Sequence, residues 1–181
     1  MKTAITKFTN QKSVSNGTYT LKIGYPALTL GAVSELEHIV NKRQRVLEVG
    51  CGGSTVFWAK NCKNLKSFET DLDWCITVGK KIKRLKNVEL KLRKNRQIIQ
   101  KISQEPDNHY DIILINSDPN QTRRILMANA AVPKIKHNGY LIINNYQTFG
   151  MENFSYPPNW EVFTFDQSGY PGRGTRFCKK V

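Results

Sequence analysis

The sequence predicts an α/β domain with a doubly wound, mostly parallel sheet. Three observations support this prediction. Short apolar runs alternate along the chain with amphipathic segments of helical period. The first apolar run leads into a glycine-rich turn, "GCGGST". Two late β-like runs, 161–165 and 175–178, follow each other without a helix between them, which predicts an antiparallel finish at one edge.

The first 24 residues have no strong period, so we interpret 1–24 as an N-terminal extension that serves as a substrate lid and 25–181 as the folded domain. The domain is expected to begin with an amphipathic helix capped by Thr29. Its apolar face consists of residues at helical spacing: Ala32, Val33, Leu36, Ile39 and Val40.

Strands and helices then alternate. Buried strands are predicted at 46–49, 65–69, 88–92, 111–115 and 140–143, the last following an Asn138-Gly139 turn. The segments between them are predicted helices, which cover 55–61, the stripe Trp74, Val78, Ile82 and Leu85, the group Ile98, Ile99 and Ile102, and 122–132 before Pro133.

Length and composition indicate one globular domain with a strongly basic surface. The chain has 181 residues, of which 39% are hydrophobic, and a net charge of +14. Such a charge fits a polyanionic partner, an anionic substrate or only a soluble surface. The tract 80–96 has nine basic residues and one acid, and it fits either a solvated helix face or a binding surface. We expect four further basic residues to add surface charge elsewhere: Arg123, Arg124, Lys134 and Lys136.

The cysteines and histidines show no metal-binding pattern. Cys51, Cys62, Cys75 and Cys178 form no CxxC pair and no cluster with His38, His109 or His137, so we expect neither a metal site nor a disulfide scaffold. We also read no catalytic base from the histidines. The amino terminus has no signal-peptide pattern, and no apolar run reaches the length of a membrane span. These features predict a cytoplasmic protein.

The glycine turn carries the functional prediction. Gly50, Gly52 and Gly53 allow a sharp turn and close approach of a ligand at the start of a helix. Glu48, before the turn, attracts a cationic ligand, whereas Glu69, nineteen residues after Gly50, suits the paired hydroxyls of a ribose. S-adenosylmethionine has a ribose and an ammonium group, and therefore satisfies both carboxylates.

Four segments resemble motifs of the class I, Rossmann-like S-adenosylmethionine-dependent methyltransferases: "VLEVGCGGST", "SFETD", "YDIILIN" and "IKHNGYLIINN". The run Glu69-Thr-Asp-Leu-Asp-Trp74 is similar to that of small, single-domain bacterial members. The resemblance implies a seven-stranded sheet with an antiparallel C-terminal strand, methyltransferase activity and S-adenosylmethionine as cofactor. It implies a set of cofactor-binding residues: Glu48, Gly50, Cys51, Gly52, Gly53, Ser54, Thr55, Glu69, Thr70, Asp71, Asn95 and Asn116.

Several of these residues also fit structural roles. Glu48 fits a cap for the following helix, and Glu69 with Asp71 fits a cap for the lysine-rich helix. Trp74 fits core packing as well as an adenine contact, and Trp58 is predicted to lie in the core. Cys51 fits a small turn residue better than a nucleophile. Thr55, at the third glycine position of a dinucleotide fingerprint, argues with Glu48 against a nicotinamide-dependent oxidoreductase.

The acceptor side is less defined. Asn116 and Asn144 occupy positions where the family often has acids, which argues against a metal-dependent catechol-type mechanism. Asp118, at the end of the fourth strand, is the predicted catalytic base, although a helix cap fits it equally. Without an added substrate domain, a small-molecule acceptor is favoured; the alternative, from the charge, is a nucleic-acid-binding or RNA- or DNA-methylating protein. Two aromatic segments, 145–159 and 170–174, fit lids or packed loops.

Overall fold

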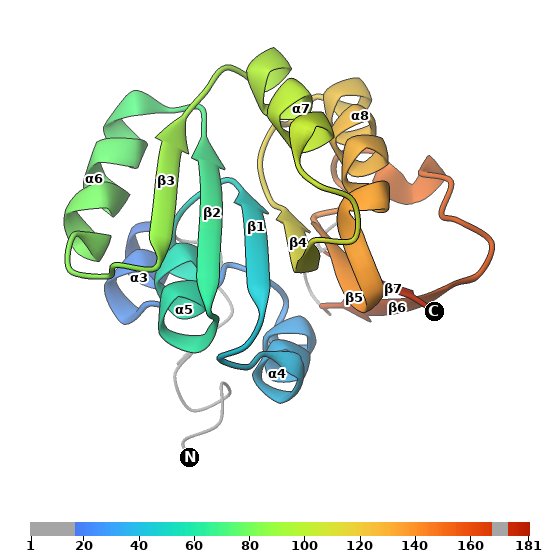
Figure 1. Ribbon diagram of the computed structural model, residues 1–181, viewed down its shortest axis with the longest axis horizontal. Coiled ribbons are helices and arrows are strands. Elements are labelled where there is room, and N and C mark those ends of the chain that lie inside the picture. Colours follow the sequence, from blue (N-terminus) through green and yellow to red (C-terminus); the bar gives the residue numbers. More distant parts are fainter. Residues whose placement is uncertain (1–16, 168–173) are drawn as a thin grey trace.

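A seven-stranded sheet in the order β3-β2-β1-β4-β5-β7-β6 forms the centre of the computed structural model, which describes residues 17–167 and 174–181 (Figure 1). β1 to β5 are parallel, and β7 runs antiparallel to β5 and β6. The predicted fold class is therefore confirmed. The strands are β1 (Arg45–Val49), β2 (Asn64–Glu69), β3 (Val88–Leu92), β4 (Tyr110–Ile115), β5 (Ile135–Asn144), β6 (Trp160–Asp166) and β7 (Gly174–Lys180).

Helices cover both faces of this sheet. α4, α5 and α6 pack on one face, joined by α3 at the amino end, and α7 and α8 pack on the other. Their bounds are α3 (Gly17–Ile23), α4 (Leu30–Ile39), α5 (Gly53–Asn61), α6 (Leu72–Ile82), α7 (Asn95–Gln104) and α8 (Gln121–Ala131). Two short 3-10 turns, η1 (Val132–Lys134) and η2 (Met151–Asn153), follow α8 and β5.

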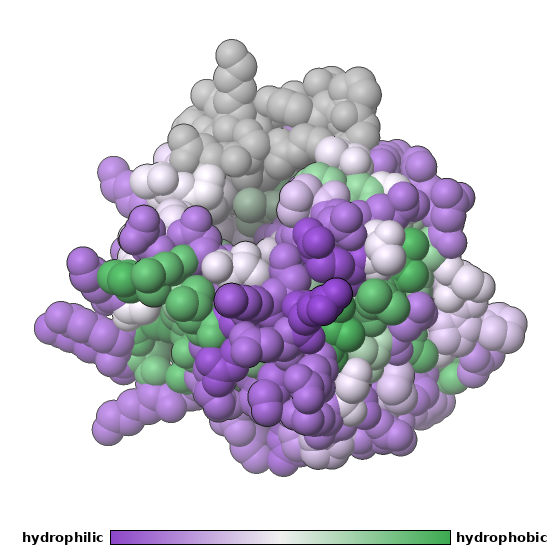
Figure 2. All heavy atoms as spheres, turned by 90° about the horizontal axis from the view of Figure 1, so that it is seen from above, coloured by the Kyte–Doolittle hydropathy of each residue, from purple (hydrophilic) through white to green (hydrophobic). Residues whose placement is uncertain are grey.

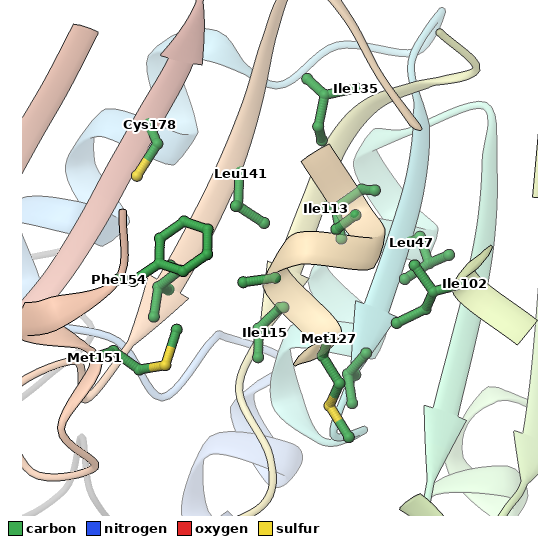
Figure 3. Close-up of a cluster of buried hydrophobic side chains, with 14 of the residues drawn as sticks. Leu47, Ile102, Ile113, Ile115, Met127, Ile135, Leu141, Met151, Phe154 and Cys178 are labelled. Atoms are coloured by element: carbon green, nitrogen blue, oxygen red, sulfur yellow. The ribbon is translucent and has the colours of Figure 1, made fainter. Parts of the chain in front are cut away.

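Alternation along the strands divides the core between the two faces. In β1, Leu47 and Val49 contact the α7–α8 side, whereas Val46 contacts α4 and α5. Figure 3 shows the α7–α8 cluster, in which Ile102 and Met127 approach the strand residues. Glu48 alternates with these residues and so faces α5. The pleat of β1 therefore places a carboxylate inside the molecule.

The fifth strand differs from its prediction. It begins at Ile135 instead of residue 140, because the Asn138-Gly139 turn forms an irregularity within the strand. Asn138 has a positive φ of 63°, and a Cβ on Gly139 would lie 2.9 Å from the carbonyl oxygen of Asp111. The chain thus kinks against β4 and resumes parallel pairing with it in a shifted register.

Two predicted surface charges are in fact buried. Arg124 and Lys134 are 1% and 7% exposed. Lys134 pairs with Asp107 at 2.6 Å, whereas Arg124 contacts backbone carbonyls at the ends of β4 and β5. The prediction that both contribute to the basic surface is wrong, because their partners come from distant segments.

The structure describes only some of the segments that we considered as lids. Residues 1–16 and 168–173 lie outside the described residues, so a lid role for them stays a prediction. Residues 17–23 form α3, which packs against α5. Within 145–159, Tyr146, Met151 and Phe154 are buried in the α7–α8 core, which favours a packed loop (Figure 3). Among the helices described, none combines the length and apolar character needed to cross a bilayer.

Candidate cofactor site

The glycine turn lies where the strand order reverses. β1 pairs with β2 on one side and with β4 on the other, so the turn after β1 occupies the topological switch point. The carboxyl ends of β2 and β3 point upward in Figure 1, and Figure 2 views the molecule from that side. Hydrophilic atoms dominate the middle of this face. Hydrophobic atoms form patches at the left and at the right of this face. Two hydrophobic residues of α6, Leu72 and Ile76, are exposed.

Two positions of the turn require glycine, each for a different structural reason. Gly50 has a φ of +92°, and a Cβ there would lie 2.8 Å from the Cβ of Ser117 and 2.9 Å from the carbonyl oxygen of Asn116. A Cβ on Gly53 would lie 2.1 Å from the carbonyl oxygen of Tyr25. Gly50 therefore lets the turn approach the end of β4, and Gly53 lets α5 approach the segment after α3.

Glu48 is fully buried beneath the turn. Its Oε2 accepts hydrogen bonds from the hydroxyls of Thr55 at 2.7 Å and Ser67 at 2.8 Å, and Thr55 in turn accepts the N–H of Gly52. Its Oε1 has no partner among the described residues. Burial raises the pKa of Glu48 to about 7, although the nearby hydroxyl groups of Ser54, Thr55 and Ser67 lower it. Glu48 thus supports the first turn of α5 and keeps one acceptor unpaired.

Glu69 ties the turn to the end of β2. Its Oε2 accepts the N–H of Cys51 at 3.0 Å, and its Oε1 accepts the N–H groups of Thr70 at 2.6 Å and Asp71 at 3.0 Å. The hydroxyl of Thr70 also donates to Oε1, at 3.4 Å. A carboxylate oxygen has two lone pairs, and Oε2 accepts only the N–H of Cys51 among the described residues, so Oε2 has one lone pair left for a ligand hydroxyl. The side chain lies close enough to Glu48 to raise the pKa of that residue further. Both predicted carboxylates therefore flank one turn.

Trp74 covers the turn from α6. Its indole N–H donates to the carbonyl oxygen of Cys51 at 2.7 Å, and its ring lies 3.7 Å from the Cβ position of Gly52. Asp71 caps α6 by accepting the N–H of Trp74 at 2.7 Å. Burial raises the pKa of the Cys51 thiol, which agrees with a turn residue and not with a nucleophile.

Asn95 begins α7 beyond the end of β3, and its Oδ1 is buried without a hydrogen-bond partner among the described residues. An unpaired buried carbonyl oxygen is costly unless a donor reaches it. The structure thus leaves unpaired acceptors on two predicted site residues, Glu48 and Asn95.

Asn116 belongs to a network that joins the ends of β4 and β5. Its Oδ1 accepts from the amide of Asn144 at 2.7 Å, and the same amide donates to the carbonyl oxygen of Ala27 at 3.0 Å. Thr175, on β7, donates to the Oδ1 of Asn144 at 2.9 Å. The two asparagines are therefore paired with each other, in an arrangement that two ionised carboxylates could not adopt without repulsion.

Asp118 forms a bidentate ion pair. Its carboxylate accepts from Arg123 at 2.5 and 2.8 Å and from the N–H of Asn120 at 2.9 Å, and its side chain is fully buried. Burial opposes ionisation, but these hydrogen bonds outweigh it and lower the pKa of Asp118. The contacts favour a structural role at the start of α8, and the catalytic role stays a prediction.

Arg124 was not predicted as part of this region. Its guanidinium donates to the carbonyl oxygens of Ser117 at 2.7 Å, Ile115 at 3.3 Å and Asn144. Burial lowers its pKa to about 10. In sequence it shares helical spacing with three core residues, Met127, Ala128 and Ala131, and this position is the signal that identifies it. Arg124 thus holds together the carboxyl ends of β4 and β5, which border the turn.

Solved structures with the same fold are known, although no family model and no curated protein matches the sequence. A Streptococcus mutans protein proposed to be a methyltransferase, in complex with SAH, has a TM-score of 0.65 and 15% identity, covering 81% of this chain and 93% of that one. An rRNA methylase from Streptococcus thermophilus has a TM-score of 0.65 and 11% identity, covering 81% and 92%.

An O-methyltransferase from Bacillus cereus, in complex with SAH, has a TM-score of 0.63 and 17% identity, covering 76% of this chain and 74% of that one. Together with the switch-point turn, these likenesses establish the fold of the protein. The chain has the class I, Rossmann-like methyltransferase fold.

Proposed function

We propose that this protein is an S-adenosylmethionine-dependent methyltransferase whose acceptor is a small molecule. The observation that carries the proposal is the pair of carboxylates, Glu48 and Glu69, on either side of one switch-point turn. The fold and its solved neighbours support it, since two of those neighbours contain the demethylated product SAH. The described residues form one domain around a single sheet, and a small acceptor fits such a domain.

The chemistry of the unpaired acceptors fits this cofactor. Glu48 offers a buried carboxylate oxygen to an ammonium group, and Asn95 offers a buried carbonyl oxygen to an adenine amine. Glu69 keeps one lone pair, on Oε2, for a ribose hydroxyl. When bound, the cofactor supplies a methyl group already activated by its sulfonium.

Under this proposal the chain's own task is positioning. Gly50 brings the turn against the end of β4, and Arg124 holds that end to β5 through backbone carbonyls. Held together in this way, the turn and the ends of β4 and β5 form a rigid surface that aligns an acceptor with the methyl group and limits the motion of the acceptor. The other predicted cofactor contacts remain part of this proposal: Cys51, Gly52, Gly53, Ser54, Thr55, Thr70, Asp71 and Asn116.

Removal of a proton from a hydroxyl or amine acceptor by Asp118 stays a prediction, and the contacts of this residue do not favour it. Its carboxylate is held by Arg123, so this ion pair must open before Asp118 accepts a proton. An acceptor that is already deprotonated in water needs no such step.

Titration calorimetry with S-adenosylhomocysteine tests the proposal. We expect micromolar binding by the natural protein. A ligand that lacks the 2′-hydroxyl should bind about 10- to 100-fold more weakly, because it loses a hydrogen bond to a charged acceptor. Glu69→Gln should bind both ligands weakly and discriminate little between them.

Asp73→Asn is the matched control, since Asp73 is an exposed acid in the first turn of α6. It should keep the affinity and the discrimination of the natural protein. Absence of binding at millimolar ligand would refute the cofactor assignment. Equal discrimination by Glu69→Gln and the natural protein would refute the ribose contact alone.

A further inference from the structure

A basic pocket lies at the opposite end of the sheet from the glycine turn. It has a volume of about 360 Å³ and is bordered by the first residues of β1, β2, β3 and β4. In Figure 1 it corresponds to the lower ends of the strands. We call it the amino-edge pocket, and its cationic lining residues are Arg45, Lys66 and Lys86.

A second pocket lies beside it, between α5 and the end of α6. This helix pocket also has a volume of about 360 Å³, and five cationic residues line it: Lys60, Lys80, Lys81, Lys83 and Arg84. The two pockets share the turn between α6 and β3, with Lys83 to Leu85 on one side and Lys86 to Val88 on the other. Asn87 fastens this turn to α5 by donating to the carbonyl oxygens of Ala59 and Cys62.

The charges around this turn are poorly compensated. Of the eight cationic residues, Lys66 alone has carboxylate partners, Glu105 at 2.6 Å and Glu89 at 3.8 Å, in the described ranges. All 14 acidic residues of the sequence belong to those ranges, so the other seven cations have no carboxylate partner. Glu89, which also borders the pocket, is shared by Lys66 and Lys91.

The positive charge of this region also affects the pKa of His109, which lies near Arg45. His109 borders the amino-edge pocket, and burial together with the nearby Arg45 guanidinium lowers its pKa. A single phosphate would neutralise two charges at most, whereas seven uncompensated cations on both sides of one turn match a series of phosphates.

We propose that the amino-edge pocket and the helix pocket together bind successive phosphates of a nucleic-acid backbone. The described lining offers His109 and the buried Tyr110 as its aromatic rings, so it lacks a platform for stacked bases. The expected ligand is therefore a duplex, recognised through its backbone with little dependence on sequence. Because the site lies away from the glycine turn, it is independent of methyl transfer.

Fluorescence anisotropy with a labelled 16-base-pair RNA duplex, over a range of salt concentrations, tests this proposal. Arg45→Gln and Lys86→Gln should each weaken binding and reduce the slope of log affinity against log salt by about 1. Lys101→Gln is the charge-matched control, because Lys101 is an exposed residue of α7 without a carboxylate partner among the described residues. It should leave the slope unchanged.

Several outcomes would overturn the proposal. Equal effects of Lys86→Gln and Lys101→Gln would show that net charge alone attracts the duplex. Inorganic pyrophosphate that competes as well as the duplex at equal phosphate concentration would indicate a small phosphorylated ligand. Poly-glutamate that binds as tightly, with the same response to the variants, would refute a nucleic-acid partner. Far-ultraviolet circular dichroism of each variant confirms that the fold is intact.

Discussion

The role of an individual side chain in this protein depends on its burial and on its hydrogen-bond partners. Glu48 is the clearest case: an acid in a strand of apolar residues remains inside because Thr55 and Ser67 donate to it. Its alternative interpretation, a cap for the following helix, agrees with the Thr55 contact. Its proposed role, an acceptor for the ammonium group, depends on the oxygen that stays unpaired.

The raised pKa of Glu48 predicts a specific dependence of stability on pH. The folded carboxyl, with a pKa of about 7, keeps its proton more tightly than an unfolded one near 4.5. The folded state therefore binds more protons between these values, and the free energy of unfolding falls as the pH rises through that window.

Glu48→Gln removes this titration and keeps hydrogen bonding to the hydroxyls. Relative to the natural protein, the variant should gain about 3 kcal/mol between pH 5 and pH 8. Urea unfolding of both proteins at the two pH values measures this difference. A parallel pH dependence of the two proteins would show that Glu48 titrates normally.

Asp118→Asn separates the two roles of that residue. Because Arg123 occupies the carboxylate, we expect a lower melting temperature and less than about a tenfold loss of kcat. Thermal unfolding and initial rates, once an acceptor is found, measure both effects. A loss of about 100-fold or more at unchanged stability would instead establish Asp118 as the group that removes the proton.

At the scale of elements, the sequence predicts the order of strands and helices along the chain, but it does not predict which of them contact each other. β3 occupies the predicted range, and β1, β2 and β4 each begin one residue before theirs, whereas β5, β6 and β7 are longer than predicted by two to six residues. α3 was not predicted, because a seven-residue helix is too short to show a period. It packs against α5, and the close approach depends on Gly53.

Gly53→Ala should therefore destabilise the protein. The added Cβ would lie 2.1 Å from the carbonyl oxygen of Tyr25 and 2.4 Å from that of Thr20, and backbone atoms cannot yield easily. We expect a loss of about 1–3 kcal/mol in the free energy of unfolding. Gly79→Ala is the matched control: its nearest atom is 4.0 Å away within α6, and the change should stabilise that helix slightly. Equal effects of the two substitutions would contradict this account.

At the scale of the whole molecule, the net charge of +14 has two components. Arg124 and Lys134 are inside, where they hold chain segments together. Eight of the other basic residues line the two pockets beside the turn between α6 and β3, at the opposite end from the glycine turn. The protein thus has two chemically different ends: a carboxyl edge with buried acids beneath a turn, and an amino edge with uncompensated cations.

The sequence alone predicts the fold class, the alternation of strands and helices and the location of the glycine turn. These follow from local periodicity and from motifs of neighbouring residues, which short-range interactions encode. The tertiary structure alone decided that Arg124 fastens β4 to β5, that Glu69 binds the backbone of the turn, and that basic residues converge on two pockets. Such features join residues far apart in the chain, so their energies depend on contacts and burial that no local pattern contains.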